Sequence, residues 1–333
     1  MRKDSIFGLR FLKVPYSIKF LPRTPMTELT ERLLPSLLQN AELSKKGVAL
    51  LQKAHKQILR LDESSRSAED WFILGYYAQQ VQQYDDAQAH YTQAVLKNPE
   101  FEAAYKFRAM VCIETRQFED AQYDLDKALE LDPDFSDARY ERARLFHETD
   151  QDDKAVAELR ALIQQDSEYA DAYALMGSTF EKTGKYEQAI KAFEQALELD
   201  PENGHYLTQR GLAHYFAGEY ELAESDLLEA QKRTGINHIT QFNLALVLSE
   251  NPASVKEAYR NFEKAFKRAP DMLNHFYEQS GSVERKRLDL RLDTILSKNQ
   301  DLEKEESSQF YRKELILLLE RKLREARTRI AAE

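Results

Sequence analysis

The chain has 333 residues, of which 42% are hydrophobic and 31% are charged, and its formal net charge is -10. The hydrophobic share is sufficient for a folded core and therefore excludes a wholly disordered chain. Ten glycines and nine prolines are few for this length, and because both residues break helices, their scarcity favours an all-α fold. The single cysteine, Cys112, excludes an internal disulfide and a four-cysteine zinc site.

Charge is distributed unevenly along the chain. Residues 1–25 carry six basic side chains and one acidic, residues 68–270 carry 21 basic and 38 acidic, and residues 271–333 carry 13 of each. Nucleic-acid binding needs a basic face for the phosphates, so the acidic middle argues against it. It favours protein partners that are basic or neutral.

The sequence shows neither a membrane span nor a secretory signal. No apolar run approaches the roughly 18 residues that a transmembrane helix requires. The first residues also lack the continuous apolar stretch of a signal peptide. We therefore expect a cytoplasmic protein.

Residues 1–25 alternate apolar with basic side chains and contain three prolines. This pattern predicts a basic extended arm and not a helix. Contact with a partner is the favoured role, docking on the chain itself or disorder is the second, and membrane contact or targeting is the least favoured. The next segment, residues 26–67, is predicted to form N-terminal capping helices, because residues 58–62 (ILRLD) resemble residues 128–132 (ALELD).

A repeat with a period of 34 residues occupies residues 68–270. Alanines recur at Ala87, Ala121, Ala155, Ala189, Ala223 and, after 35 residues, Ala258. Upstream of each lies a small residue, at Gly75, Ala109, Ala143, Gly177, Gly211 and Ala245. Four residues after each alanine lies a large apolar residue, at Tyr91, Leu125, Leu159, Phe193, Leu227 and Phe262. Small residues allow two antiparallel helices to approach closely, and the large residue fills the space beside them, so each unit is predicted to be a helical hairpin.

These units resemble the tetratricopeptide repeat family. The resemblance is closest in the first unit, where Trp71, Leu74 and Gly75 match the family signature and Ala87 and Pro99 follow. It implies an all-α fold, a right-handed α-α superhelix (a tetratricopeptide solenoid) with flanking capping helices. Six repeats are expected, at residues 68–101, 102–135, 136–169, 170–203, 204–237 and 238–270.

Residues 271–333 are predicted to form C-terminal helices. Within them, a 3-4-3-4 spacing typical of a short coiled-coil seam connects Ile316, Leu319, Leu323, Ala326 and Ile330. The favoured interpretation is a cap packed on the sixth repeat. Dimerisation or partner binding through this seam is the alternative, and the oligomeric state stays open.

The sequence contains none of the common catalytic motifs. The sequence has no glycine-rich phosphate loop, no Gly-x-Ser-x-Gly and no His-Glu-x-x-His motif. Its seven histidines show no metal-ligand spacing, and Cys112 is expected to be a buried apolar residue and not a nucleophile. We expect no catalytic residues, no metal, no cofactor and no enzymatic activity.

The resemblance also implies a concave groove lined by the first helix of each hairpin. Counting along each unit, the fifth, ninth and twelfth positions are among those expected to face inward. The residues predicted to bind a partner are Phe72, Tyr76, Lys106, Met110, Tyr140, Arg144, His147, Thr208, Leu212 and Tyr215. Aromatic side chains offer contact area at low entropic cost, which suits a peptide or helix segment of another protein. The alternative for any one residue is packing against a neighbouring hairpin.

Two hypotheses of function follow. The leading one is a non-catalytic scaffold or adaptor that holds a partner segment in the groove. The second is a structural subunit of a larger complex, which contacts its neighbours through the arm and the C-terminal helix. One specialised function within the family, capture of a chaperone C-terminus, is disfavoured, because Lys106 begins the required pattern but Met110 and Glu141 break it.

Overall fold

The computed structural model describes residues 28–38, 45–251, 254–269, 292–293, 317–320 and 322. Over these residues the secondary structure is helical, with no strand, which confirms the all-α class. The predicted basic arm at residues 1–25 and most of the predicted C-terminal helices at residues 271–333 lie outside the described part of the chain.

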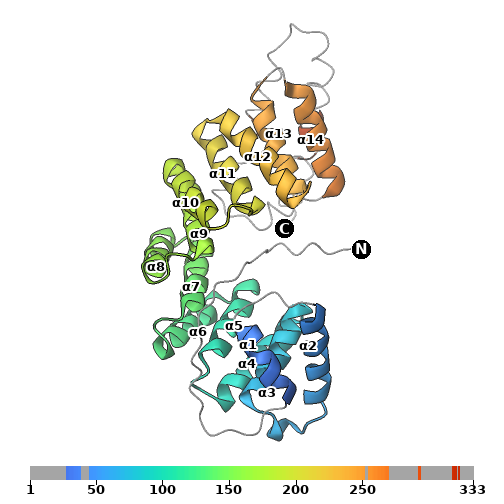
Figure 1. Cartoon of the computed structure of the whole chain (residues 1–333), viewed down its shortest axis with the longest axis vertical. Helices are drawn as coiled ribbons and strands as arrows, with labels where there is room; N and C mark the ends of the chain where they lie inside the picture. Colours follow the sequence, from blue (N-terminus) through green and yellow to red (C-terminus); the bar gives the residue numbers. More distant parts are fainter. Residues whose placement is uncertain are drawn as a thin grey trace. The chain divides into compact units, whose positions relative to one another are not determined.

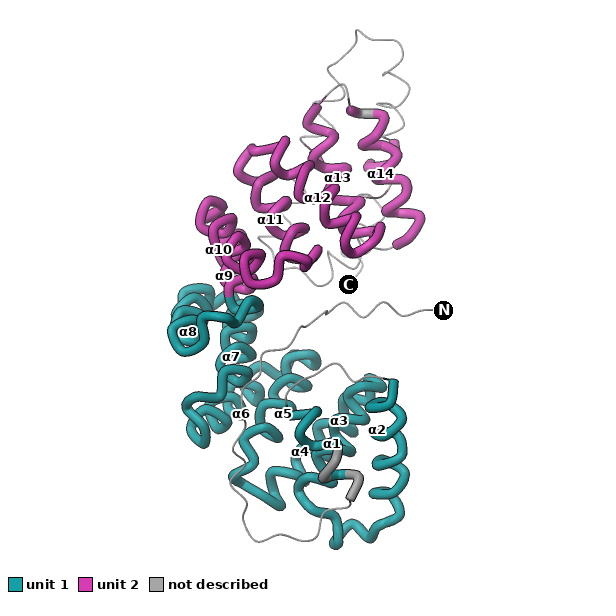
Figure 2. The backbone as a smooth tube through the Cα atoms, viewed as in Figure 1, with its two compact units in different colours: residues 1–172 teal, residues 173–333 magenta. Residues whose placement is uncertain are grey.

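The chain divides into two compact units, residues 1–172 and residues 173–333 (Figure 2). The repeat pattern did not predict this division, because its period continues through the boundary. The boundary lies near the start of the fourth predicted repeat, inside the helix Ala170–Lys182.

Unit 1 is a stack of antiparallel helical hairpins (Figure 1). Its helices are α1 (Glu28–Leu38), α2 (Lys45–Ile58), the 3₁₀ turn η1 (Glu63–Ser65), α3 (Ala68–Gln80), α4 (Tyr84–Lys97), α5 (Glu102–Glu114), α6 (Phe118–Leu131), α7 (Ser136–Glu148) and α8 (Asp152–Gln165). The hairpins are α3–α4, α5–α6 and α7–α8, and within the unit α4 packs on α5 and α6 packs on α7. One continuous hydrophobic core runs from α1 into α7.

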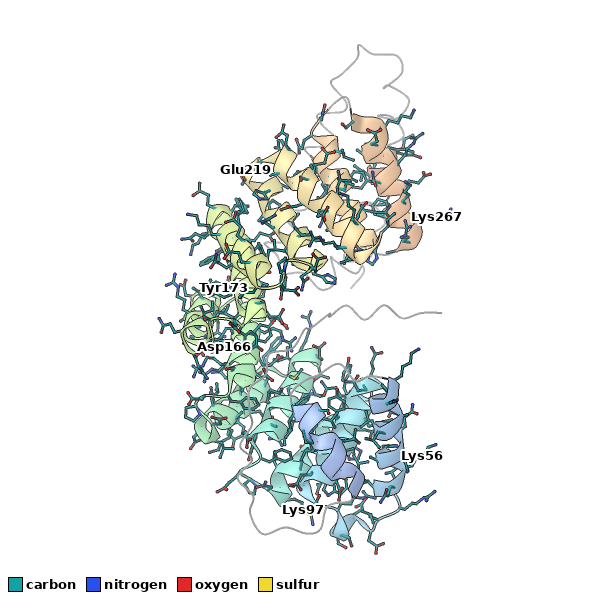
Figure 3. All side chains as sticks on the ribbon, viewed as in Figure 1. Lys56, Lys97, Asp166, Tyr173, Glu219 and Lys267 are labelled. Carbon is teal, nitrogen blue, oxygen red and sulfur yellow. The ribbon has the colours of Figure 1, made fainter. Side chains whose placement is uncertain are left out.

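Unit 2 repeats this arrangement. Its helices are α9 (Ala170–Lys182), which begins in the last residues of unit 1, α10 (Tyr186–Leu199), α11 (Gly204–Ala217), α12 (Tyr220–Thr234), α13 (His238–Ser249) and α14 (Val255–Arg268). The hairpins α11–α12 and α13–α14 pack side by side and share a core. In both units charged side chains such as Lys56 on α2 and Lys267 on α14 are exposed (Figure 3).

The small residue of each unit faces the large residue of the second helix. A Cβ atom on Gly75 would lie 2.7 Å from the ring of Tyr91, which is closer than packed side chains tolerate. Gly177 stands in the same relation to Phe193, at 2.8 Å. In the second and third repeats the small residue is alanine and the large residue is a leucine, which leaves room for the extra methyl group.

In the first five repeats, the turn between the two helices of the hairpin has a left-handed backbone at one position. Residues with positive φ recur with the 34-residue period at Gln82, Arg116, Asp150, Gly184 and Gly218. Glycine adopts this conformation without strain, whereas the first three residues hold it against their own preference. The hairpin packing therefore overrides local preference in unit 1.

The first repeat is tied to the N-terminal helices at the start of α3. Ser67 and Asp70 form a capping box, in which each side chain binds the other residue's backbone N–H. The hydroxyl of Thr30 on α1 donates a 2.6 Å hydrogen bond to the same Asp70 carboxylate. This contact fixes α1 against α3 and brings the α1 leucines into the core of unit 1.

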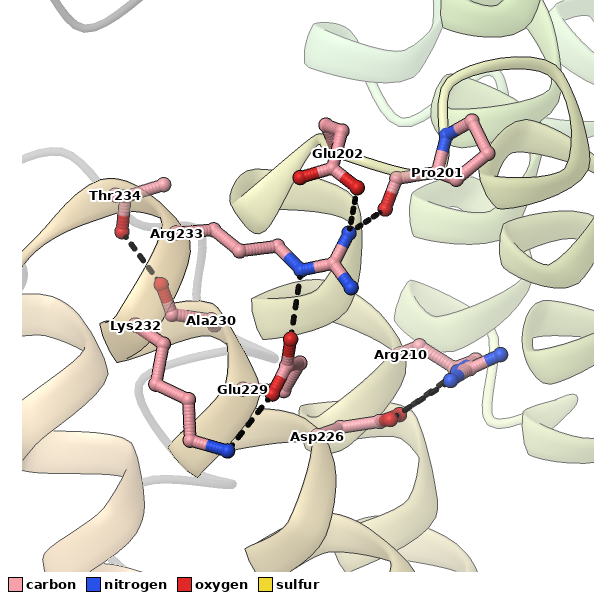
Figure 4. Close-up of polar contacts among 9 residues, drawn as sticks. All are labelled: Pro201, Glu202, Arg210, Asp226, Glu229, Ala230, Lys232, Arg233 and Thr234. Atoms are coloured by element: carbon pink, nitrogen blue, oxygen red, sulfur yellow. Dashed lines mark hydrogen bonds and ion pairs between the residues drawn. The ribbon is translucent and has the colours of Figure 1, made fainter.

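A partly buried ion pair joins the two helices of several hairpins, with an arginine 16 residues before its acidic partner. Arg108 binds Asp124 through two hydrogen bonds of 2.6 and 2.7 Å. Arg210 binds Asp226 in the same bidentate manner, at 2.7 Å for both bonds (Figure 4). Arg142 reaches Glu158 at 2.8 Å.

A second recurring contact ties the end of a hairpin to the loop before it. Lys97, labelled in Figure 3, donates to the backbone carbonyl of Ser64 at 3.1 Å. Arg233 donates to the carbonyl of Pro201 and pairs with Glu202 and Glu229 (Figure 4). These bonds satisfy loop carbonyls that the helices leave unpaired.

Substitution of Asp124 by alanine is expected to destabilise unit 1 by about 3 kcal/mol, because Arg108 is left charged and unpaired in a mostly buried position. The double variant Arg108→Met/Asp124→Ala is expected to return to within about 1 kcal/mol of the wild type. The fourth repeat carries Met176 and Ala192 at the equivalent positions, so the hairpin accepts this apolar pair.

Trp71, the single tryptophan, lies in α3, so its fluorescence during urea unfolding reports on unit 1. A double variant as unstable as Asp124→Ala alone would show that the loss does not come from the unpaired arginine.

Candidate partner-binding face

Five of the ten residues predicted to line the groove are buried, and for these side chains the prediction of an open surface is wrong: Phe72, Tyr76, Lys106, Thr208 and Tyr215. Phe72 is fully buried, with its ring centroid 5.1–5.6 Å from those of Tyr91, Phe101 and Phe107. Its position faces the contact between the first and second hairpins and not the solvent.

Lys106 is also a core residue, only 1% exposed. Its ammonium lies 4.2 Å from the ring centroid of Phe107 and 3.2 Å from the carboxylate of Asp137 on α7. A buried cation needs such partners, because its desolvation is otherwise unfavourable. Lys106 therefore holds α5 and α7 together and does not offer its charge to a partner.

The remaining buried residues make contacts within their own units. The ring of Tyr76 packs edge-on against Phe107, at 5.7 Å between centroids. Thr208 donates to the backbone carbonyl of Gly204 at 2.8 Å. Tyr215 donates to Glu250 at 3.1 Å.

The other five predicted residues are half-buried and retain an accessible surface: Met110, Tyr140, Arg144, His147 and Leu212. Four of them lie in unit 1, with Met110 on α5 and the rest on α7, and α5 packs against α7. Leu212 lies in unit 2 and packs against the core of that unit. Most of the predicted residues that remain accessible therefore lie on α5 and α7. We call the surface around Met110, Tyr140, Arg144 and His147 the α5–α7 face.

An aromatic pair forms one side of the α5–α7 face. The rings of Tyr140 and Tyr169 stack at 5.5 Å between centroids, with 27° between their planes. The Tyr169 hydroxyl donates a 3.1 Å hydrogen bond to Asp137, the residue that also binds Lys106. Burial, and after it the carboxylate of Asp171, raises the pKa of Tyr140 well above its ordinary value. The tyrosine is therefore a neutral hydrogen-bonding and stacking group at any physiological pH.

An ion cluster around Arg144 forms the other side. Its guanidinium contacts the carboxylates of Glu141 at 2.8 Å, Glu148 at 3.2 Å and Glu114 at 3.3 Å. Glu114 belongs to α5, so this last pair joins α5 to α7. Three carboxylates around one guanidinium leave a surplus of negative charge at the accessible surface.

The titration of Glu148 reflects both its burial and its charged neighbours. Burial, the largest cause, raises the pKa of Glu148 above its ordinary value. Arg144 and, more weakly, Arg116 oppose this rise, and the carboxylates of Glu114 and Glu141 reinforce it. Burial removes water from Arg144, which on its own lowers the pKa of the guanidinium. The surrounding carboxylates outweigh this effect, so the pKa of Arg144 lies above its ordinary value. A second cation near Glu148 would therefore be stabilised by the cluster.

Other reactive groups do not gather on this face. Cys112 is buried, as predicted, and burial together with nearby carboxylates raises the pKa of its thiol to about 11. Within the described residues, no group of three His, Cys, Asp or Glu side chains has the geometry of a metal site. Nor does any helix there combine the length and the apolar character needed to cross a bilayer.

Tyr169 was missed by the sequence analysis because it lies in the loop after α8 and not in the first helix of a repeat. A signal was present nonetheless. Aromatic residues occupy the last position of the first three repeats, at Phe101, Phe135 and Tyr169. The structure buries the first two, Phe101 and Phe135, and leaves only the third at the surface.

Comparisons with known proteins bear on the fold. Three family models described as tetratricopeptide repeat match residues 74–121, 113–178 and 170–203. No curated protein matches the chain in sequence. Proteins of this family are, in general, non-enzymatic protein-interaction scaffolds.

Three solved structures resemble the chain at low sequence identity. The structure of the APC/C hetero-tetramer Cut9–Hcn1 is 16% identical and covers 72% of this chain and 46% of that chain, with a TM-score of 0.61. A tetratricopeptide repeat protein from Parabacteroides merdae is 16% identical over 73% and 92%, with a TM-score of 0.57. The pilF protein of Pseudomonas aeruginosa is 17% identical over 72% and 99%, with a TM-score of 0.50. These likenesses support the solenoid fold.

Replacement of Glu148 by glutamine is expected to stabilise unit 1 slightly at neutral pH. The folded-state pKa of Glu148 lies above its unfolded value, so its contribution to stability is present at acidic pH and is lost as the pH rises through the folded pKa. Because the side chain is 37% exposed, solvent screening holds this effect below about 1 kcal/mol.

Urea unfolding followed by Trp71 fluorescence at neutral and at acidic pH measures this difference. The matched control is Glu119→Gln, an exposed carboxylate on α6. A gain for Glu148→Gln that persists unchanged at acidic pH would contradict the titration argument.

Proposed function

We propose that this chain, which belongs to the tetratricopeptide repeat family, is a protein-interaction scaffold that holds an extended basic segment of a partner on the α5–α7 face of unit 1. The observation that carries the proposal is the position of the stacked Tyr140–Tyr169 pair beside the Arg144 cluster. Stacked tyrosines offer a rigid apolar surface, and the neighbouring carboxylates supply a charge that selects among partners.

The argument for a basic segment rests on charge. Arg144 is shared among three carboxylates, of which Glu114 is the most exposed. A lysine or arginine from a partner would satisfy the surplus carboxylate without displacing Arg144, and its aliphatic stem would pack on the tyrosine rings. An acidic segment would meet repulsion from the same groups.

The proposed protein is non-catalytic, cytoplasmic and independent of a cofactor. Its binding face consists of hydrogen-bonding, stacking and ion-pairing groups already engaged with one another. None of them is an activated nucleophile, since the one thiol is buried with a raised pKa. The family's general role supports the same conclusion.

An assembly subunit is the second candidate. It is favoured by apolar side chains on the second helices of two hairpins, Leu96 on α4 at 68% exposed and Tyr123 on α6 at 62%. Exposed apolar residues of this size mark contact surfaces when they cluster. In this alternative, residues 1–25 and the C-terminal helix also contact neighbouring subunits. Deletion of residues 1–25 would then abolish incorporation into the complex, whereas peptide binding on the α5–α7 face would persist.

Selection from a library of random peptides displayed against the full chain tests the leading proposal. We expect enrichment of lysine and arginine over acidic residues. The affinity of the best peptide should fall about tenfold in Glu114→Gln/Glu148→Gln and in Tyr140→Ala, as is typical for residues central to an interface. It should also weaken with added salt.

The matched control for this measurement is Tyr123→Ala, which removes an exposed tyrosine from α6 in the same unit. Its affinity should equal that of the wild type. Equal affinities for all the variants, or a selected set rich in Asp and Glu, would refute the assignment of the α5–α7 face.

A further inference from the structure

Tyr169 differs from the residues that hold the same place in the two repeats before it. The last position of the first and second repeats is a phenylalanine, at Phe101 and Phe135, and both side chains are buried. Packing in the core therefore holds those two rings. In the third repeat the residue is a half-buried tyrosine in the loop between α8 and α9. A half-buried ring keeps more of its rotamer freedom, so one orientation requires a further contact.

The hydroxyl of Tyr169 makes that contact. It donates a 3.1 Å hydrogen bond to one carboxylate oxygen of Asp137, which lies in the first turn of α7. Burial, and after it the charge of Asp137, raises the pKa of Tyr169 well above its ordinary value. The hydroxyl therefore keeps its proton and remains a donor. The bond ties the loop after α8 to the start of α7.

The other oxygen of the same carboxylate is held from inside the core. It lies 3.2 Å from the ammonium of Lys106 on α5. The Lys106 side chain is 1% exposed, and its ammonium lies 4.2 and 5.5 Å from the ring centroids of Phe107 and Phe135. Because each carboxylate oxygen has its own partner, the orientation of the Asp137 side chain is fixed. Asp137 thus connects a buried cation to an accessible ring.

We propose that Asp137 is a positioning residue for partner binding: it fixes the ring of Tyr169 against that of Tyr140, and Lys106 fixes its carboxylate from the core. This role rests on the function proposed for the α5–α7 face, and it adds the residues that set the geometry of that face from behind. Rings that are already in place lose less conformational entropy when a partner binds, which raises the affinity.

The network also separates the two sides of the α5–α7 face. The charge of Asp137 is paired with that of Lys106, so the network positions the rings without adding net charge. Selection of a basic segment then comes from the carboxylates around Arg144. Loss of the contact between Tyr169 and Asp137 should therefore weaken binding without changing its salt dependence, whereas Glu114→Gln/Glu148→Gln should reduce the salt dependence.

The experiment removes single groups of the network and measures the affinity of the full chain for the peptide selected against it. Tyr169→Phe deletes only the hydroxyl and leaves Asp137 paired with Lys106. It should weaken binding about fivefold, the effect of one hydrogen bond, with an unchanged salt dependence. Tyr123→Phe is the matched control, because it removes the hydroxyl of an exposed tyrosine on α6. Its affinity should equal that of the wild type.

A double-mutant cycle tests whether the hydroxyl acts through the carboxylate. Lys106→Met/Asp137→Ala removes the ion pair without leaving an unpaired buried charge, and urea unfolding followed by Trp71 fluorescence checks that unit 1 stays folded. In this background, adding Tyr169→Phe should change the affinity by less than about twofold. A further loss as large as that in the wild type would mean that the hydroxyl acts through another group, and it would overturn the proposal.

Hydrogen exchange of the free protein gives a second readout that needs no peptide. The backbone N–H of Tyr169 donates to the carbonyl of Asp166, and that of Ala172 donates to the carbonyl of Tyr169. In Tyr169→Phe, exchange over residues 166–172 should be at least about threefold faster than in the wild type, because the loop opens more often. Tyr123→Phe should leave it unchanged. Unchanged exchange in Tyr169→Phe overturns the positioning role whether or not a peptide binds.

The measurements distinguish failure of the positioning role from failure of the binding face. A loss of affinity in Tyr140→Ala without one in Tyr169→Phe refutes the positioning role alone and leaves the face in place. Equal affinities for Tyr140→Ala and the wild type refute the face and the positioning role together.

Discussion

The close approach of a small residue on one helix to a large residue on the next is the contact on which the architecture depends. At Gly75 and Tyr91 the approach leaves no room for a methyl group, and the same geometry recurs at Gly177 and Phe193. This contact sets the distance between the helices of a hairpin. It thereby determines which side of the first helix meets the second and which side faces inward. The left-handed turn residue in the first five repeats, even where it is Gln82 and not glycine, accompanies the same packing.

In each unit, a further segment of the chain adds apolar side chains to the core of the hairpins. At the N-terminal end of unit 1, α1 is fixed to α3 through Thr30 and Asp70 and adds its leucines to the core. In unit 2, Leu318 and Leu319 join the core of the final hairpin. A hairpin cannot bury its apolar face alone, and these segments take the place of a missing neighbour. On the α5–α7 face, by contrast, Tyr140 and Arg144 are only half-buried, and polar and charged groups line the surface.

Much of this fold was predictable from the sequence, because a steric contact repeated every 34 residues leaves a periodic record of small and large side chains. The accessibility of the inward positions was not predictable in this way. It depends on what packs against each position from elsewhere in the chain: Phe72 meets the aromatic residues of the next hairpin, and Lys106 finds a carboxylate on α7. Tyr169 enters the candidate site from a loop, outside the helix that the repeat register assigns to the groove.

The central claim, that inward positions are enclosed at α3 and α13 but open on α7, is tested most directly by cysteine labelling. Cysteine is placed at the ninth position of the first, third or sixth repeat, as Tyr76→Cys, Arg144→Cys or Leu246→Cys, and its reaction with a maleimide is timed. Cys112 stays in place, because it is buried with a raised pKa and reacts slowly. The account predicts labelling at residue 144 at least about tenfold faster than at residues 76 and 246, where reaction requires local opening. Equal rates at the three positions would contradict it.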